Sequence, residues 1–544
     1  MAWYDPHRLR DLPQLHPHAG WLWPVALLLG VAVGYAVTGF RLAISGLQFL
    51  FYGVDDAMLH SAAAEAHWAQ VLFLPVLGGL AVGLLLTRMT SDGKARGVAD
   101  VIKAAALRGG RVERRPGIAS AAASLITLST GGSTGREGPA VHIGAIMASW
   151  VADRMRATGI TGRDILGCAA AAAVSASFNA PLAGTLFALV VVLRHYALQA
   201  FGPIVVAAVA AAVVSRIHMG NVTEFVLPAH GVEFYWEMPA FMLLGLVAGV
   251  VAVVFVRSIF IAEDLGDRAQ AALGLPNWAR PAVAGLLLGI IALEFPHVIG
   301  VGYETTTLAL TGAVPFWTAV LFAGIKAAAV AITLAGRMGG GVFSPALMLG
   351  ALLGSAFGAI AIAVFPSVSG SLGLYALAGM GAVAAAVLGA PISSTLIVFE
   401  LTGDFQAGIA VMVAVSLASV VADRMGARSF FLTQLERGGL LLSAGPQGYL
   451  MTTVQVSHVM RPRGSETGAS ETACWELHAQ GACLGPEQTL AHALPMLARL
   501  KGSFLPVVAE GPDGQAELLG AVFQTDAQRA YIRVLEDELR EEHS

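Results

Sequence analysis

One acidic residue stands alone in an apolar part of the chain, within the segment Gly135-Arg136-Glu137-Gly138-Pro139. Glu137 is the only acid between Glu113 and Asp153. Glycines interrupt the chain there, and proline is tolerated in the first turn of a helix, so we expect Glu137 at a helix N-terminus. An ionisable group at membrane depth costs about 2.5 to 3.5 kcal/mol, so it usually serves a function. A carboxylate at this position can occupy the place of a bound anion, and protonation would release it from that place. The alternative is that Glu137 only caps the helix.

This segment has a counterpart later in the chain. Gly135 to Ala145 aligns with Gly341 to Ala351, and both stretches place a glycine shortly before a proline. A second pair follows in the same order, because Ala180-Pro181 matches Ala390-Pro391. One match arises easily by chance in glycine-rich apolar sequence, but two matches in order at nearly the same spacing indicate duplication. The sequence therefore predicts an internal repeat whose halves pack as an inverted pair, as in many transporters.

The repeat implies four helix N-termini, which begin near Glu137, Pro181, Val342 and Pro391. The first N–H groups of a helix lack intrahelical partners, and the helix dipole adds roughly half a positive charge at that end. In lipid these groups need a partner, and a desolvated anion can supply one. If the four N-termini converge, they bind an anion without a fixed lysine or arginine, which would hold the ion too strongly for fast transit.

The composition places these helix ends in a membrane. Hydrophobic residues make up 56% of the chain and charged residues 12%, and the mean hydropathy of +0.70 lies outside the range of soluble domains. No Asp, Glu, Lys or Arg occurs from Met338 to Phe399 or from Ile165 to Leu193. Either run exceeds the roughly 20 apolar residues of one spanning helix, and we expect more than ten membrane segments, several too short to span. Further apolar segments are Trp21 to Phe40, Val71 to Thr87, Ala240 to Val256, Ala282 to Leu293, Pro315 to Ile325 and Ile409 to Val421.

The orientation follows from the loop between Arg88 and Arg115. It contains eight basic residues and three acidic ones, so the positive-inside rule places it in the cytoplasm. Two apolar segments precede this loop, which puts the N-terminus in the cytoplasm too. Met1 to Gly20 is polar and contains prolines and histidines, unlike a secretory signal peptide.

Other classes of function lack their motifs. Cys168, Cys474 and Cys483 are too few and too scattered for a disulfide framework or a zinc site, and no other metal site is expected. No basic patch suited to nucleic acid is visible. The apolar segments contain no His-Glu-x-x-His, no Gly-x-Ser-x-Gly and no paired aspartates, so we do not expect an enzyme. A cation-coupled solute transporter stays a rival, although it normally places more carboxylates in the membrane than Glu137 and Glu400.

These motifs resemble the CLC family of chloride channels and proton/chloride exchangers. Gly135 to Pro139 has the form of the family's glutamate-bearing selectivity motif, and Gly341-Val342-Phe343-Ser344-Pro345 has the form of its Gly-x-Phe-x-Pro motif. Phe178 to Gly184 and Phe399 to Gly403 also look like family sequence. The resemblance implies an α-helical homodimer with one anion path per subunit, which Glu137 blocks from outside. It implies a path lined by the amides of Val342 and Phe343, and we assign Gly135, Gly138 and Phe431 to the same anion site. Arg136 is expected there too, acting through its charge, or else in a structural ion pair.

Three positions depart from the family pattern. The motif Gly-Ser-Gly-Ile-Pro appears as Ala95-Arg96-Gly97-Val98-Ala99, so Arg96 replaces the serine that would contact the central anion. Arg96 is expected either at the cytoplasmic mouth, where it would attract anions, or on the surface as an ordinary cytoplasmic arginine. Phe431 replaces the usual tyrosine and removes a hydroxyl donor. Val191 occupies the place of the inner glutamate that relays protons in many exchangers.

After Gly438 the composition becomes that of a soluble domain. Three segments there resemble a CBS module: Ser457 to Pro462, Leu505 to Val508 and Leu518 to Val522. Amphipathic helices are expected over Pro486 to Leu500 and Ala527 to Leu539. Such modules usually pair, so a dimer partner could supply the second one. Thr525-Asp526 matches a position that often holds a nucleotide ribose, which suggests an adenine nucleotide as cofactor; a purely structural dimer contact is the alternative.

Together these features predict an all-α polytopic membrane protein with an inverted internal repeat of broken helices and a small α/β CBS-like cytosolic tail. The expected domains are a cytoplasmic segment (1–20), a transmembrane anion-transport domain (21–438) and a cytosolic regulatory domain (439–544). Expected partners are chloride or a similar monovalent anion, the lipid bilayer of the cell membrane and a second copy of the chain, without nucleic acid. Valine at position 191 cannot carry a proton, and Arg96 and Phe431 weaken the central site, which favours passive conduction gated by protonation of Glu137. Proton/chloride exchange is the alternative, and a nucleotide sensor acting through the tail is a third hypothesis.

Overall fold

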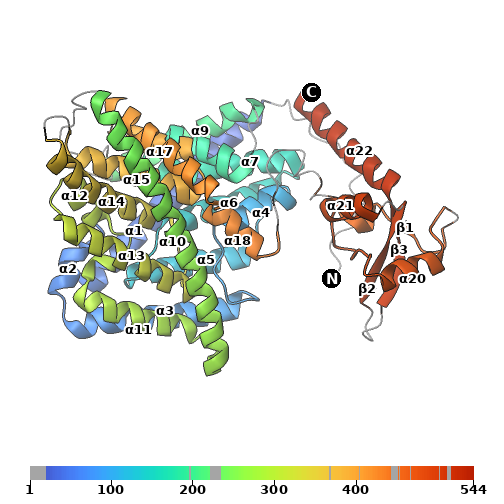
Figure 1. Cartoon of the computed structure of the whole chain (residues 1–544), viewed down its shortest axis with the longest axis horizontal. Helices are drawn as coiled ribbons and strands as arrows, with labels where there is room; N and C mark the ends of the chain where they lie inside the picture. The colour runs from blue at the N-terminus through green and yellow to red at the C-terminus, as the bar shows by residue number, and fades with distance from the viewer. Residues whose placement is uncertain are drawn as a thin grey trace. The chain divides into compact units, whose positions relative to one another are not determined.

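The computed structural model of the 544-residue chain describes residues 20–157, 159–194, 198–220, 235–366, 369–402, 405–440, 442, 451, 454–465, 467–500, 503–510 and 516–543. The described residues form two compact units, Gly20–Gln434 and the tail that begins at Leu435 (Figure 1). The larger unit is built of helices, and the tail contains a small sheet. The predicted class, an all-α membrane protein with an α/β tail, is therefore confirmed.

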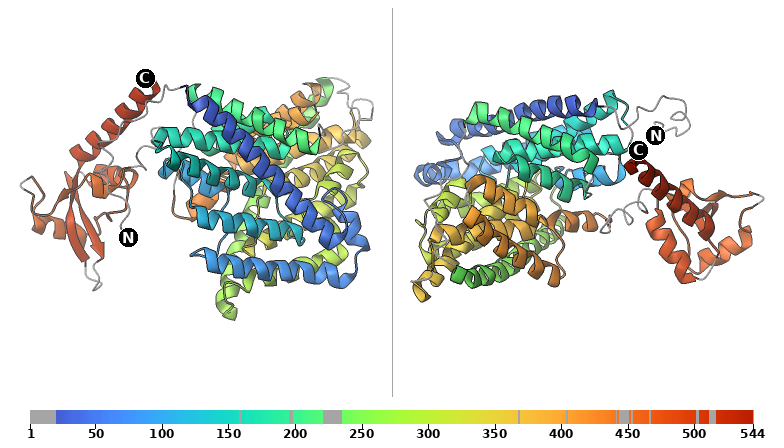
Figure 2. Two further views of the ribbon diagram at one scale, coloured as in Figure 1. Left: turned by 180° about the vertical axis from the view of Figure 1, so that it is seen from behind. Right: turned by 90° about the horizontal axis from the view of Figure 1, so that it is seen from above.

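The first half of the larger unit begins with the long helix α1, which packs obliquely against α7 and α9 (Figure 2). Short helices alternate with long ones because glycine and proline interrupt the chain repeatedly. The helices of this half are α1 (Leu22–Tyr52), α2 (Leu59–Glu65), α3 (Trp68–Met89), α4 (Val98–Leu107), α5 (Arg114–Ser129), α6 (Glu137–Arg154), α7 (Gly159–Phe178), α8 (Pro181–Phe187), the π-helix η2 (Ala188–Leu193) and α9 (Leu198–Met219).

The second half contains the longest helix, α10, which packs against α13, α15 and α17 (Figure 1). Its helices are η3 (Tyr235–Glu237), α10 (Met238–Leu273), α11 (Arg280–Glu294), η4 (Pro296–Val298), α12 (Tyr303–Leu310), α13 (Phe316–Ala335), α14 (Phe343–Val364), α15 (Leu372–Leu388), α16 (Pro391–Thr402), α17 (Phe405–Arg424) and α18 (Phe430–Arg437).

The helices of the larger unit are apolar on the outside as well as inside. Seven of those described are long and apolar enough to cross a membrane, and shorter apolar segments lie between them. Large apolar side chains such as Leu50, Trp236 and Trp317 are highly exposed, as a surface that faces lipid requires. An apolar helix too short to span a bilayer ends within it, which lipid tolerates only where neighbouring protein satisfies the free backbone groups.

The predicted repeat appears in the helix boundaries. Helices α6 and α14 begin at Glu137 and Phe343, inside the two aligned motifs, and α8 and α16 begin at the two aligned prolines, Pro181 and Pro391. The halves meet through the backbone: the Gly135 N–H donates to the Gly341 carbonyl at 2.7 Å, and the Gly341 N–H donates to the Gly135 carbonyl at 2.8 Å. This pair is an isolated antiparallel bridge, so the two repeats join at their motifs.

The tail folds around a three-stranded antiparallel sheet in the order β1-β3-β2. The predicted apolar stretches form its strands and helices, and Leu490, Leu497, Leu505 and Val522 lie in its core. Its elements are η5 (Val456–His458), β1 (Arg461–Pro462), α20 (Glu471–Ala479), α21 (Leu490–Leu500), β2 (Phe504–Glu510), β3 (Ala516–Phe523) and α22 (Gln524–His543).

Candidate functional site

The two motifs present matching helix N-termini to each other. Arg136 and Val342 are the N-cap residues of α6 and α14, and a proline occupies the third helical position of each. The glycines allow the chains to approach closely, because a Cβ on Gly341 would lie 3.2 Å from the Gly138 nitrogen. The starts of both helices therefore lie close together. This arrangement is suited to an anion.

The Glu137 carboxylate lies across this region. Its side chain is buried, and Oε1 accepts hydrogen bonds from the hydroxyl of Ser344, in the first turn of α14, and from the hydroxyl of Tyr303 at 3.2 Å. Oε2 lies beside Gly135, and no hydrogen-bond donor for this oxygen is present among the residues that the structure describes. The carboxylate thus crosses from its own helix to the N-termini of two others and occupies a place where an external anion would find the same donors.

The neighbouring Arg136 is buried and turns toward another set of groups. Its guanidinium lies 3.8 Å from the Asp56 carboxylate and 4.7 Å from the centre of the Tyr303 ring. Gln48 donates to the other oxygen of Asp56 at 3.2 Å. The structure therefore shows Arg136 in a buried ion pair and a cation–π contact. These contacts connect the segment after α1 with the tyrosine that contacts Glu137.

A buried lysine holds the segment that leads to Tyr303. Lys326, in the middle of α13, is fully buried and donates to the carbonyls of Val298 and Gly300 at 3.1 and 2.9 Å. Gly300 and Gly302 have φ angles of +68° and +94°, which favour glycine, and they turn the chain into α12. The lysine and these glycines thus fix the first residue of α12, which is Tyr303.

Sequence reasoning missed Tyr303, Ser344, Lys326 and Asp56 as residues of this site. One signal was available: Lys326 is the only charged residue within the apolar helix Phe316–Ala335, and a charge in such a helix usually serves a function. Nothing in the sequence indicated which groups it would contact.

The residues of the motif Ala95 to Ala99 lie in and before α4. The Arg96 guanidinium makes two hydrogen bonds to the Asp92 carboxylate, at 2.8 and 3.2 Å. Partial burial raises the pKa of Asp92, but the hydrogen bonds and charge of Arg96 outweigh it and hold that pKa below its usual value. The Gly97 N–H, at the start of α4, donates to the Asp100 carboxylate at 2.9 Å. Arg96 is thus paired with a carboxylate, which reduces the positive charge that it offers to an anion.

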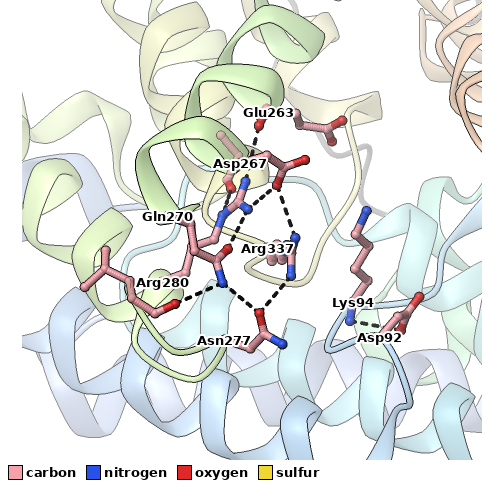
Figure 3. A network of polar contacts seen from close by, with 10 residues as sticks. Asp92, Lys94, Glu263, Asp267, Gln270, Asn277, Arg280 and Arg337 are labelled. Carbon is pink, nitrogen blue, oxygen red and sulfur yellow. Dashed lines mark hydrogen bonds and ion pairs between the residues drawn. The ribbon is translucent and has the colours of Figure 1, made fainter. Parts of the chain in front are cut away.

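A polar network holds the turn before the second motif (Figure 3). Arg280 donates to the Ala335 carbonyl, at the end of α13, at 2.7 Å and forms an ion pair with Asp267. Arg337 donates to the same carboxylate at 3.1 Å. The φ angle of Arg337 is +59°, an uncommon conformation for a residue other than glycine. The network therefore fixes the backbone just before Gly339 and, through it, the N-terminus of α14.

Three further candidate residues, Phe343, Phe431 and Val191, make apolar contacts. The Phe343 ring is buried and lies 4.8 Å from the ring of Phe178. Phe431, the second residue of α18, is buried and contacts Phe430. Val191 lies in the π-helix η2, which packs against α4. The structure thus places all three in the interior of the larger unit.

The expectation that four helix N-termini converge is not met at α8. The N–H groups of Leu182 and Ala183 both donate to the carboxylate of Glu400 at 2.9 Å. Glu400 belongs to α16, the repeat counterpart of α8, and the two helices pack together. A protein carboxylate therefore already satisfies this N-terminus, and the second intramembrane acid acts as a helix cap.

In the tail, the carboxylate expected at a nucleotide ribose has a protein partner. The Nε of Arg461 donates to Asp526 at 2.7 Å, and the guanidinium lies 4.2 Å from the centre of the Phe523 ring. A nucleotide that used Asp526 would have to displace Arg461. Across the described part of the chain, no group of three or more His, Cys, Asp or Glu side chains is arranged to hold a metal ion.

Comparisons with known proteins agree on one family. Residues 78–423 match the family model described as "Voltage gated chloride channel". The voltage-gated ClC-type chloride channel ClcB of Escherichia coli O157:H7 is 32% identical over 75% of this chain and 97% of its own length. A slow cyanobacterial Cl⁻/H⁺ antiporter has a similar fold, with a TM-score of 0.68, 23% identity, and coverage of 78% of this chain and 99% of the antiporter. A eukaryotic CLC transporter has a TM-score of 0.67 and 19% identity, with 93% of this chain and 97% of the transporter covered.

Proposed function

Because the chain belongs to the voltage-gated chloride channel family, we propose that it moves chloride and similar small monovalent anions along a path that the Glu137 carboxylate closes. It is a multi-pass membrane protein of that family. The observation that carries the proposal is the position of Glu137, whose Oε1 accepts from Ser344 and Tyr303 at the facing N-termini of α14 and α12. An anion arriving there would compete with the carboxylate for the same donors. Protonation removes the charge of Glu137 and frees the site.

The proposed path binds its anion with amides and hydroxyls. Neutral donors compensate dehydration only in part, so weakly hydrated monovalent anions should pass more readily than sulfate or phosphate. The residues assigned to the anion are Gly135, Gly138, Val342, Phe343 and Phe431. Arg136 is assigned to the electrostatics of the site, since its guanidinium lies against Asp56 and Tyr303.

For the mode of transport, we propose exchange of chloride against protons. Sequence analysis favoured passive conduction, but the similar fold of a cyanobacterial Cl⁻/H⁺ antiporter supports exchange. The chemistry of Glu137 supports it too, because one carboxylate is both the competitor of the anion and a proton acceptor. Anion arrival and proton arrival are then alternatives at the same group, as coupled transport requires. Passive conduction is the second candidate, and Val191 favours it because valine cannot relay a proton from the cytoplasm.

The experiment that tests this proposal is a reversal-potential measurement on reconstituted protein under imposed chloride and pH gradients. Exchange predicts a potential that shifts with both gradients, whereas a potential that follows chloride alone would establish passive conduction. The Glu137→Gln variant should lose the response to the pH gradient and keep chloride flux. If its flux kept the pH dependence of the parent protein, the assignment of Glu137 as gate would be wrong.

Orientation, assembly and the tail complete the proposal. The basic loop between Arg88 and Arg115 supports cytoplasmic termini, and we propose a homodimer with one anion path in each subunit. The tail would then act as a cytosolic regulatory module that pairs with its copy in the dimer. An adenine nucleotide at Thr525-Asp526 requires that Arg461 leave Asp526. Binding of labelled ATP to the intact protein, with Asp526→Asn as the control, tests that assignment.

A further inference from the structure

We propose that Tyr303 is the latch that holds Glu137 in its closed position, so that the tyrosine hydroxyl sets how easily a proton opens the path. This inference rests on the proposed function, because it assigns a positioning residue to the gate. In the closed form the Tyr303 hydroxyl contacts the carboxylate and not an anion. It acts through the Glu137 carboxylate, and its effect should therefore appear in the pH dependence of transport.

The contacts of the carboxylate place Tyr303 in this role. Its hydroxyl donates to Oε1 of Glu137 at 3.2 Å, and the Ser344 hydroxyl donates to the same oxygen. Within the described residues Oε2 has no donor, so the closed position depends on the donors at Oε1. A hydrogen bond to a charged acceptor is about twice as strong as one to a neutral acceptor. The Tyr303 hydroxyl therefore favours the deprotonated, closed form over the protonated one.

The surroundings fix the tyrosine rather than the carboxylate. Arg136 lies over the Tyr303 ring at 4.7 Å and is itself paired with Asp56. Lys326 donates to the carbonyls of Val298 and Gly300, in the segment that precedes α12. The charged and titratable groups around the gate are thus Arg136 from α6, Lys326 from α13, Asp56 from the segment after α1, and Tyr303 from α12. Three of them are tied to one another or to backbone, so protonation of Glu137 can release the carboxylate while the latch stays in place.

The direct test is the Tyr303→Phe variant, which removes the hydroxyl and keeps the ring against Arg136. Chloride efflux from proteoliposomes is measured as a function of pH. Loss of a hydrogen bond to the carboxylate should move the midpoint of the pH–flux curve upward by about one unit, a tenfold change in proton concentration. Tyr52→Phe is the matched control, because the buried Tyr52 hydroxyl donates to the Thr130 carbonyl at 3.3 Å rather than to the gate. Its midpoint should equal that of the parent protein.

A second variant covers the case in which Tyr303→Phe does not fold. Incorporation of 3-fluorotyrosine at position 303 keeps the ring and makes the hydroxyl a stronger donor, so the midpoint should move downward. An unchanged midpoint in either folded variant would overturn the latch.

The Glu137→Gln background separates this inference from the proposed function. There the added Tyr303→Phe change should not alter the pH dependence of efflux, because no carboxylate is left to hold. An equal effect of Tyr303→Phe with and without Glu137 would also overturn the latch, since it would show a general structural role. If Glu137→Gln itself keeps the parent pH profile, the proposed function fails instead.

Discussion

Replacement of Gly135 by alanine should open the path by steric means alone. A Cβ at this position would lie 2.7 Å from Oε2 of Glu137, closer than real Cβ atoms approach such a neighbour, and 3.2 Å from both the Gly341 carbonyl and Pro345. The last two contacts exist whether the gate is open or closed, so only the contact with Glu137 distinguishes the states. The methyl group would push the end of the Glu137 side chain away, at the cost of its hydrogen bonds at Oε1, about 1 to 3 kcal/mol. The closed state should therefore become roughly five- to 150-fold less populated relative to the open state.

Chloride efflux from proteoliposomes at neutral pH measures this change, and the Gly135→Ala variant should conduct faster than the parent protein. The repeat provides a matched variant: a Cβ on Gly341 would lie 3.2 Å from the Gly138 nitrogen and would cover that amide instead of meeting the carboxylate. Gly341→Ala should slow efflux without moving its pH midpoint. Gly46→Ala is the neutral control, since no atom lies within 4 Å of the added methyl. Slower or unchanged efflux in a folded Gly135→Ala protein would refute the position that we assign to Glu137.

Three further outcomes follow from other contacts. Phe431→Tyr adds the hydroxyl that the family usually places at the central site, so anion binding measured by calorimetry should tighten by a few-fold; unaltered binding would place Phe431 away from the anion. The double variant Arg96→Ser/Asp92→Asn should leave the salt dependence of flux nearly unchanged, because the two side chains form an ion pair of no net charge at 2.8 Å; a strong change would show that Arg96 attracts anions at the mouth. Arg280→Met should lower the melting temperature more than Asp267→Asn. The buried Arg280 guanidinium satisfies a carbonyl, and losing that hydrogen bond should lower the free energy of unfolding by about 1 to 3 kcal/mol. The half-exposed Asp267 should contribute less than about 1 kcal/mol. Equal melting temperatures would contradict that ranking.

The sequence predicted the parts of the fold that depend on local pattern. Charge-free runs located the membrane helices, and the two aligned motifs located the starts of α6 and α14 at Glu137 and Phe343. These predictions succeeded because glycine and proline constrain the backbone wherever they occur, and because an uncharged run of this length has few other uses. The meeting of Gly135 with Gly341 was not predicted, because the repeat predicted only that the helix N-termini would converge.

The sequence could not show which side chains would surround Glu137. Tyr303 lies far from Glu137 along the chain, and it reaches the carboxylate only because Gly300 and Gly302 turn the chain there and Lys326 holds that turn. Three-dimensional contacts of this kind leave no periodic signal. At the N-terminus of α8 the sequence predicted an anion site that the structure does not show. The proline of α8 matched the repeat, but the N–H groups there donate to Glu400 from the other half.

The buried charges around the gate explain how a cationic region can attract an anion without trapping it. Arg136 and Lys326 are both buried, Arg136 next to Glu137 in the chain and Lys326 against the segment that leads to Tyr303, and a buried positive charge acts over several ångströms in a medium of low dielectric constant. Their N–H donors, however, are directed to other groups: Lys326 donates to two carbonyls, and Arg136 lies against Asp56 and the Tyr303 ring. An anion that displaces Glu137 would feel the positive potential but would bind through amides and hydroxyls. Release then requires breaking neutral hydrogen bonds rather than a contact ion pair, which keeps transit fast.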